Sequence, residues 1–265
     1  MRYEVKELEI GGLLDQSIRL FRDHFKFMMM VACIPFFPGV MIELLRVLSM
    51  PSIQPDASQE LPPQVMMMFS PTAIILMLLT VFVTIVTTAL STGAATWGVT
   101  HRYLGHDVPA RECFRIVLRR FPRLMWAIIL YVPAVGLGMM LFLLPGIYLM
   151  FAWYVMYPVM IFEDLSAIRS MRRSRKLMVG HKGKAFIVGL LVGIIAIAAM
   201  LFGKIIPNVY AATALTEVIT AILTVFGAVV TVVIYISARC RVEHFDLELL
   251  TQMVERGRTV EEPAL

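Results

Sequence analysis

The chain has 265 residues, of which 59% are hydrophobic and only 16% are charged. Soluble domains are about half apolar and about a quarter charged, so this composition excludes one water-soluble core and predicts burial in lipid. The net charge of +5 would suggest nucleic-acid binding in a soluble protein. In a membrane protein the distribution of charge along the chain matters more, and we expect no nucleic-acid partner.

Six stretches of the chain approach the length of about 20 mostly apolar residues that a membrane-spanning helix needs. They predict an all-α bundle of six transmembrane helices in a single membrane domain, residues 1–250. The stretches are Phe27–Leu48, Pro71–Thr96, Leu124–Leu144, Pro145–Phe162, Ala185–Ile206 and Ala211–Ala238. Pro35 and Pro38 are expected to kink the first helix, and Pro145 and Gly146 to form a tight turn between the third and fourth. Residues 251–265 are predicted to be a flexible cytoplasmic tail.

The positive charges lie on alternate connections. All of the 24 Lys and Arg residues except Arg46 and Lys204 fall within residues 1–26, 98–123, 163–184 and 239–265. The other connections between predicted spans are nearly free of cations. The positive-inside rule therefore predicts a multi-pass protein of the bacterial inner membrane, with both termini and both long basic loops in the cytoplasm.

Three of the basic segments, Gly11–Phe25, Ala110–Phe121 and Leu165–Val179, alternate apolar and basic residues with a helical period. We expect each to be a short amphipathic helix at the membrane interface, with its apolar face in lipid and its cations near anionic headgroups. The candidate contacts to lipid or to a membrane or cytoplasmic protein partner are Arg19, Arg22, Arg115, Arg119, Arg172, Arg173, Arg175 and Lys176.

The same three segments share a pattern of a small residue, any residue, a basic residue and an aliphatic residue. It occurs at Ser17–Leu20, Cys113–Ile116 and Ser174–Leu177, and a hairpin of two predicted spans follows each copy. Copies that enter the membrane from the same side would form three parallel repeats. Chance similarity among basic amphipathic helices is the alternative.

Polar residues inside the predicted spans are candidates for a solute path. Threonines at spacings of three and four share one face of the second span and one face of the sixth. The candidates are Thr84, Thr88, Thr220, Thr224 and Glu217. Ordinary helix packing through small residues and interhelical hydrogen bonds is the simpler interpretation.

The sequence predicts no enzyme. We find no nucleophile elbow, phosphate-binding loop, dinucleotide fingerprint or metal-ligand spacing, and therefore expect no catalytic residue, cofactor or metal. Only Glu163 and Asp164 are adjacent carboxylates that could exchange protons. Their position at the start of a predicted helix favours a capping role instead.

Three further segments have a recognisable pattern: LEIGGLLDQSIRLFRDHF (Leu8–Phe25), YPVMIFEDLSAIRSMRRSRKLMVGH (Tyr157–His181) and IYISARCRVEHFDLELL (Ile234–Leu250). Together they resemble the bacterial glycerophosphoryl diester phosphodiesterase membrane-domain family. The ending departs from the family pattern at His244, where a glycine is usual. The resemblance implies the membrane region alone, because His101 and Arg102 are followed by Tyr103 and not by the glycine of the family's catalytic motif.

Two functions therefore remain open at this point. The first is a non-catalytic scaffold or regulator of uncharacterised role, which binds a partner or lipid at its basic cytoplasmic face. The alternative is a transporter or lipid-translocating protein built on the hairpins and the threonine faces.

Overall fold

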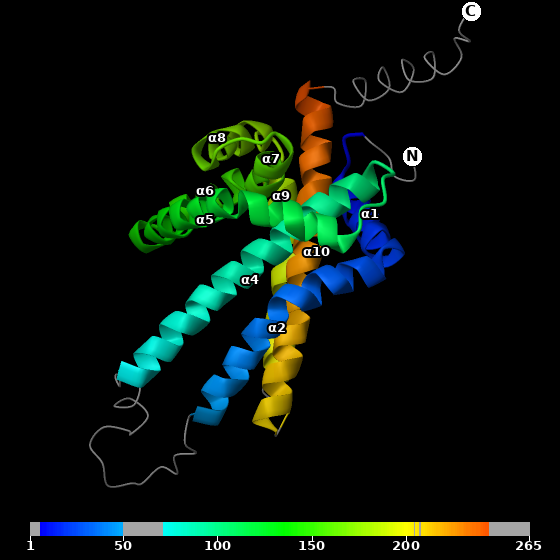
Figure 1. Cartoon of the computed structure of the whole chain (residues 1–265). Coiled ribbons are helices and arrows are strands. Elements are labelled where there is room, and N and C mark those ends of the chain that lie inside the picture. Colours follow the sequence, from blue (N-terminus) through cyan, green and yellow to red (C-terminus); the bar gives the residue numbers. More distant parts are fainter. Residues whose placement is uncertain (1–5, 50–70, 204, 207, 244–265) are drawn as a thin grey trace, which may run out of the picture.

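The computed structural model describes residues 6–49, 71–203, 205–206 and 208–243. In this part of the chain every regular element is an α-helix (Figure 1). The helices are α1 (Ile10–Asp23), α2 (Phe25–Ser49), α4 (Pro71–Tyr103), α5 (Ala110–Leu141), α6 (Leu143–Ala152), α7 (Met156–Phe162), α8 (Ala167–Leu177), α9 (Lys182–Gly203) and α10 (Val209–Glu243). The predicted tail, residues 251–265, lies outside the described residues.

The all-α prediction is confirmed, and the number of apolar helices agrees with it. Five segments are long and apolar enough to cross a membrane: Phe25–Ile42, Ile74–Tyr103, Ala110–Leu141, Leu143–Phe162 and Tyr210–Glu243. A sixth is counted if α8 and α9, which meet at a bend of 104°, form one broken span. Each matches one of the predicted stretches in place.

Helix α10 is the centre of the fold. It packs against α2, α4 and α9 along its length, and α1 and α8 cover its C-terminal part. The buried side chains of α10 form an almost continuous run from Ala228 to Ala238, where valine, isoleucine and alanine predominate. A helix that is apolar on all sides is expected where neighbours surround it.

The turn between the third and fourth predicted spans is misplaced in the prediction. Helix α5 ends at Leu141, Phe142 adopts an extended conformation, and α6 begins at Leu143. Pro145 lies in the first turn of α6, where its missing N–H needs no partner. Gly146 packs against α5, because a Cβ there would lie 2.5 Å from the backbone nitrogen of Met139. Gly146 therefore allows α5 and α6 to pack closely, and it does not form the turn between them.

The hairpin of α5 and α6 runs in a different direction from the other long helices. In Figure 1 it extends to one side, whereas the lower parts of α2, α4 and α10 point downwards. Its tip carries exposed apolar side chains, with Met140 86% and Leu144 79% exposed. Both segments that contain its helices, Ala110–Leu141 and Leu143–Phe162, are nevertheless long and apolar enough to cross a membrane.

The three basic segments fold differently from the prediction. Two form separate helices, α1 and α8, but Ala110–Phe121 continues through Pro122 into the third span as part of α5. The apolar faces of α1 and α8 are buried against the protein, through residues such as Leu13, Leu20 and Leu177. Helices α10 and α9 pack on α1, and α7 packs on α8, whereas Ile18 of α1 and Ile168 of α8 remain more than half exposed.

Helix α8 also supplies a hydrogen-bond donor where the helix of the fourth predicted span is interrupted. The helical bonds stop at Ala152 and resume at Met156. The Ser174 hydroxyl of α8 donates a hydrogen bond to the freed carbonyl of Ala152, at 3.0 Å. A buried carbonyl that loses its helical partner needs another donor of this kind.

Candidate functional site

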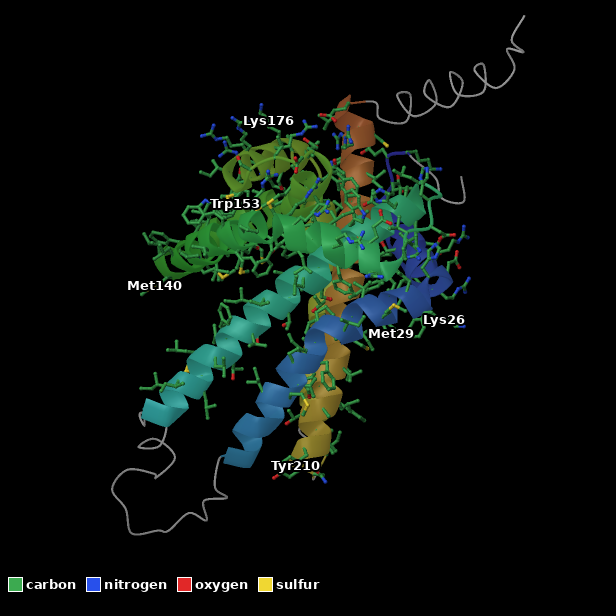
Figure 2. All side chains as sticks on the ribbon, in the orientation of Figure 1. Lys26, Met29, Met140, Trp153, Lys176 and Tyr210 are labelled. Carbon is green, nitrogen blue, oxygen red and sulfur yellow. The ribbon has the colours of Figure 1, made fainter. Side chains whose placement is uncertain are left out.

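Exposed cations gather at one end of the molecule. Figure 2 shows side-chain nitrogen atoms around α8 and the neighbouring ends of α1, α5 and α10, and places Lys176 at the opposite end from Tyr210. Of the eight predicted contact residues, these are exposed: Arg19, Arg22, Arg115, Arg119, Arg172, Arg175 and Lys176. Among the described residues none of them forms a salt bridge.

Arg173, the eighth candidate contact to lipid or a partner, is the exception, because it is engaged within the protein. Its guanidinium lies 2.8 Å from Glu163 and also pairs with Glu243, and its side chain is only 25% exposed. Its position could have been found in the sequence, because it lies three residues after Ser170 and four before Leu177, both on the buried face of α8.

The two carboxylates before α8 are engaged by cations from other helices. Glu163 accepts a hydrogen bond from Tyr235 of α10 at 3.2 Å, in addition to its pair with Arg173. Asp164 lies 2.8 Å from Arg123 and 3.4 Å from Arg120, both on α5. The residue has φ +49°, a left-handed conformation that Asp tolerates better than most residues.

These contacts replace the predicted capping role. Ser166 precedes α8 and makes no capping bond with its side chain, and Arg120 donates to the carbonyl of Ile161 near the end of α7. A cation at a helix C-terminus is favoured by the helix dipole. The carboxylates therefore connect α5, α7, α8 and α10, and the arrangement accounts for both of them as structural groups.

The exposed face of α8 carries four cations at helical spacing. Arg169, Arg172, Arg175 and Lys176 are exposed, while the opposite face packs against α5, α6, α7 and α10. Burial of one face fixes the direction in which the other points. The four positive charges are thus presented together, at the end of the molecule farthest from Tyr210 (Figure 2).

The N-terminal segment is fastened onto α9 and α10 at the same end. The backbone N–H of Leu8 donates to Ser237 at 3.0 Å, and Lys184 donates to the Leu8 carbonyl at 2.7 Å. The Glu7 carboxylate lies 3.2 Å from Lys184 and 3.6 Å from Arg241. We refer to Glu7 and Leu8 with these partners as the N-terminal clasp. Sequence reasoning missed it, because its partners are far apart in the chain.

His181 lies beneath the clasp. Its side chain is fully buried, its Nε2 is 3.8 Å from Glu7, and neither ring nitrogen has a hydrogen-bond partner. Burial lowers the pKa of His181, and the positive charges of Lys184 and Arg241 lower it further. The hydrogen bond from Lys184 lowers the pKa of Glu7. At neutral pH the clasp therefore holds an ionised Glu7 above a neutral imidazole.

A groove opens between α2 and the start of α5, with a volume of about 750 Å³. Met30 and Ile34 of α2 and Phe114 and Leu118 of α5 supply apolar walls. Ala110, Arg111, Arg115 and Arg119 complete the lining. The groove thus contains two of the predicted contact residues, Arg115 and Arg119, and adds Arg111, which the prediction did not include.

The predicted polar residues of the spans do not form one site. Thr84 and Thr220 are exposed and Thr88, Thr224 and Glu217 are partly buried. On α10 the hydroxyl groups donate to carbonyls of their own helix, Thr220 to Thr216 at 2.8 Å and Thr224 to Thr220 at 2.7 Å. No hydrogen bond within the described residues joins these threonines to Thr84 or Thr88.

Within the part of the chain that the structure describes, no group of three His, Cys, Asp or Glu side chains could hold a metal ion. Comparisons with known protein families, with curated proteins and with solved structures found no match. The fold and the contacts above are therefore the basis for a functional proposal.

Proposed function

We propose that this protein is a non-catalytic membrane scaffold whose α8 surface binds an acidic segment of a cytoplasmic protein. The α8 surface is defined as Arg169, Arg172, Arg175 and Lys176. One observation supports the proposal most strongly: these cations are exposed together and form no salt bridge within the described residues. Clustered positive charge attracts an acidic partner and accelerates its association.

Protein is a better partner for this surface than lipid. An amphipathic helix binds a membrane by inserting its apolar face, but the apolar face of α8 is already buried through Met171 and Leu177. Lys176 also lies at the far end of the molecule from Tyr210, where the apolar part of α10 begins (Figure 2). Both features favour presentation of the cations to the aqueous side.

We also propose that this end faces the cytoplasm, with both termini on that side. The proposal is supported by the positive-inside rule applied to the 24 cations of the sequence. A membrane-impermeant thiol reagent tests it in a variant without the native cysteines. Lys176→Cys should react only from the cytoplasmic side and Tyr210→Cys only from the opposite side. Labelling of both from one side would contradict the topology.

The binding proposal is tested with an oligoglutamate peptide as the probe. The full-length protein is placed in nanodiscs of zwitterionic lipid, and fluorescence anisotropy follows peptide binding as salt is raised. We expect binding that salt weakens, because exposed charges are screened within about 10 Å at 0.1 M salt. Arg172→Gln, Arg175→Gln and Lys176→Gln together should abolish it.

The matched control neutralises cations elsewhere, at Arg19 and Arg22 of α1, which are also exposed. This variant should bind the peptide as the unchanged protein does. Equal loss in both variants would indicate attraction to net charge alone and would overturn the α8 surface as the binding site.

We further propose that the resemblance to the phosphodiesterase membrane-domain family reflects a shared structural centre. Contacts between the three resembling segments support this. Leu8 in the first bonds to Ser237 in the third, Glu163 in the second bonds to Tyr235, and Arg173 pairs with Glu243. Segments that pack together are expected to retain a common pattern, even without a catalytic domain.

The alternative of a transporter or lipid-translocating protein makes a different prediction. Substitution of Thr84, Thr88 and Thr220 by alanine would reduce movement of a solute or lipid into proteoliposomes. We favour the scaffold, because the hydroxyl groups on α10 are already satisfied within their own helix. Threonine-dependent transport would reverse this preference.

A further inference from the structure

The groove between α2 and α5 owes its shape to the way both helices pack on α4. Each makes extensive contact with α4 and little with the other. Gly98 of α4 is the point of closest approach, since a Cβ there would lie 2.2 Å from the Phe27 ring and 3.2 Å from the Cys113 sulfur. Beyond this point α2 and α5 leave a space that their own side chains do not fill.

Next to the groove, Arg102 of α4 packs on Phe27 of α2. Its guanidinium lies 3.5 Å from the centroid of the Phe27 ring, and its Nε is 3.5 Å from Asp107. A cation over an aromatic face is attracted by the ring's negative charge density. Phe27 is thereby fixed one turn before Met30, which lines the groove.

The groove is lined by apolar side chains of both helices and by three arginines of α5. Met30, Ile34 and Leu118 are more than half exposed, although their side chains are fully apolar. Arg111, Arg115 and Arg119 follow each other at intervals of four residues, along one face of α5. None of the three forms a salt bridge within the described residues.

The first turn of α5 adds to the attraction for an anion. Ala110 and Arg111 line the groove and begin a helix of 32 residues. Its first backbone N–H groups and its dipole favour negative charge at that end. This contribution supplements the three arginines and would not form a site alone.

We propose that this groove binds one phospholipid with an anionic headgroup. The phosphate and headgroup pair with Arg111, Arg115 and Arg119, and one acyl chain lies against Met30, Ile34 and Leu118. The unbranched, flexible side chain of Met30 adapts to such a chain. Figure 2 places Met29 and Lys26 at the start of α2, where polar side chains give way to the apolar helices. A lipid in the adjacent leaflet reaches the groove at this level.

The inference is independent of the α8 surface, which lies on other residues and takes a protein partner. The test uses full-length protein purified in mild detergent with equal amounts of phosphatidylglycerol and phosphatidylcholine. Native mass spectrometry counts the lipids retained. We expect one retained phosphatidylglycerol, preferred over phosphatidylcholine by at least about tenfold, because three cations lie close to its headgroup.

Two variants separate the roles of charge and shape. Arg111→Gln, Arg115→Gln and Arg119→Gln together should reduce the preference to about twofold or less. Ile34→Trp keeps every charge but fills the groove, and should reduce retained lipid about tenfold. Leu118→Trp serves the same purpose if Ile34→Trp does not fold.

The control variant is Ile129→Trp, which places the same side chain at an exposed position of α5 outside the groove. It should retain lipid as the unchanged protein does, and so should the α8 variant. Equal retention of both lipids by the unchanged protein, or undiminished retention by a monodisperse groove variant, would overturn the site.

Discussion

The hydroxyl of Ser91 on α4 donates a hydrogen bond to the backbone carbonyl of Val31 on α2, at 3.3 Å. Val31 lies four residues before Pro35, which has no N–H to offer this carbonyl. Both Ser91 and Val31 are fully buried. The serine thus supplies the donor that the proline removes, and it joins α2 to α4 one turn before Pro35.

This relationship predicts a double-mutant effect. Ser91→Ala should lower the free energy of unfolding by about 1 kcal/mol, because it leaves a buried carbonyl unpaired. In a Pro35→Ala background the cost should shrink, since residue 35 then provides its own N–H. Unfolding in mixed micelles of rising SDS content measures all four proteins. An equal cost of Ser91→Ala in both backgrounds would contradict the account.

The pairing of Arg173 predicts a contrast within α8. Arg173→Gln should destabilise the protein by about 1–3 kcal/mol, because Glu163 and Glu243 both lose a charged partner while they are largely shielded from water. Arg172→Gln is the control, since Arg172 is exposed and unpaired, and it should leave stability nearly unchanged. The same unfolding measurement applies. Similar stability of the two variants would show that Arg173 holds no helix in place.

Gly146 predicts a steric effect at the α5–α6 contact. Gly146→Ala should cost about 1–3 kcal/mol, because its Cβ would lie against the backbone of Met139, which cannot rotate away. Gly136→Ala on the same hairpin meets no atom within 4 Å. That control should be neutral or stabilising by up to about 1 kcal/mol, since alanine favours helix. A stable Gly146→Ala protein would contradict the close packing.

The buried imidazole predicts a pH dependence of stability. The pKa of His181 is lowered in the folded protein, so between that value and about 6.5 the unfolded state binds the extra proton. Stability should therefore fall as the pH drops below about 6.5. Glu7 acts in a lower window, because its folded pKa lies below the ordinary carboxyl value of 4.5.

The measurement is the apparent melting temperature in detergent from about pH 7.5 to about pH 5.5. Replacement of His181 by Asn should flatten the profile over this range, whereas replacement of His106, which is exposed, should not. An unchanged slope after loss of His181 would assign the effect to another group.

Hydropathy and charge were sufficient to predict the helices but not their directions. The apolar lengths and the basic connections place the spans, because lipid requires satisfied backbone over about 20 residues. The direction of the α5–α6 hairpin depends on packing at its base, which leaves no periodic signal. The turn was misplaced because Pro145 suits both a turn and the first turn of a helix.

The exposed cations of the candidate site could be predicted from the sequence, but the groove and the N-terminal clasp could not. Helical spacing identifies the exposed cations of α8, and applied to Ser170 and Leu177 it would also have assigned Arg173 to the buried face. The groove combines side chains of α2 and α5, and the clasp joins Glu7 to Lys184 across 177 residues of sequence. Contacts at such separation follow from the fold and not from local pattern.

The central claim is that the α8 surface recruits an acidic protein. The most direct measurement compares native-membrane purifications of tagged protein, unchanged or with Arg172, Arg175 and Lys176 replaced by Gln, with mass spectrometry of the proteins retained. We predict a stoichiometric acidic partner with the unchanged protein, reduced about tenfold by the substitutions and retained when Arg19 and Arg22 are replaced instead. Recovery of the same partner by the α8 variant, or of no stoichiometric partner by the unchanged protein, would contradict the claim.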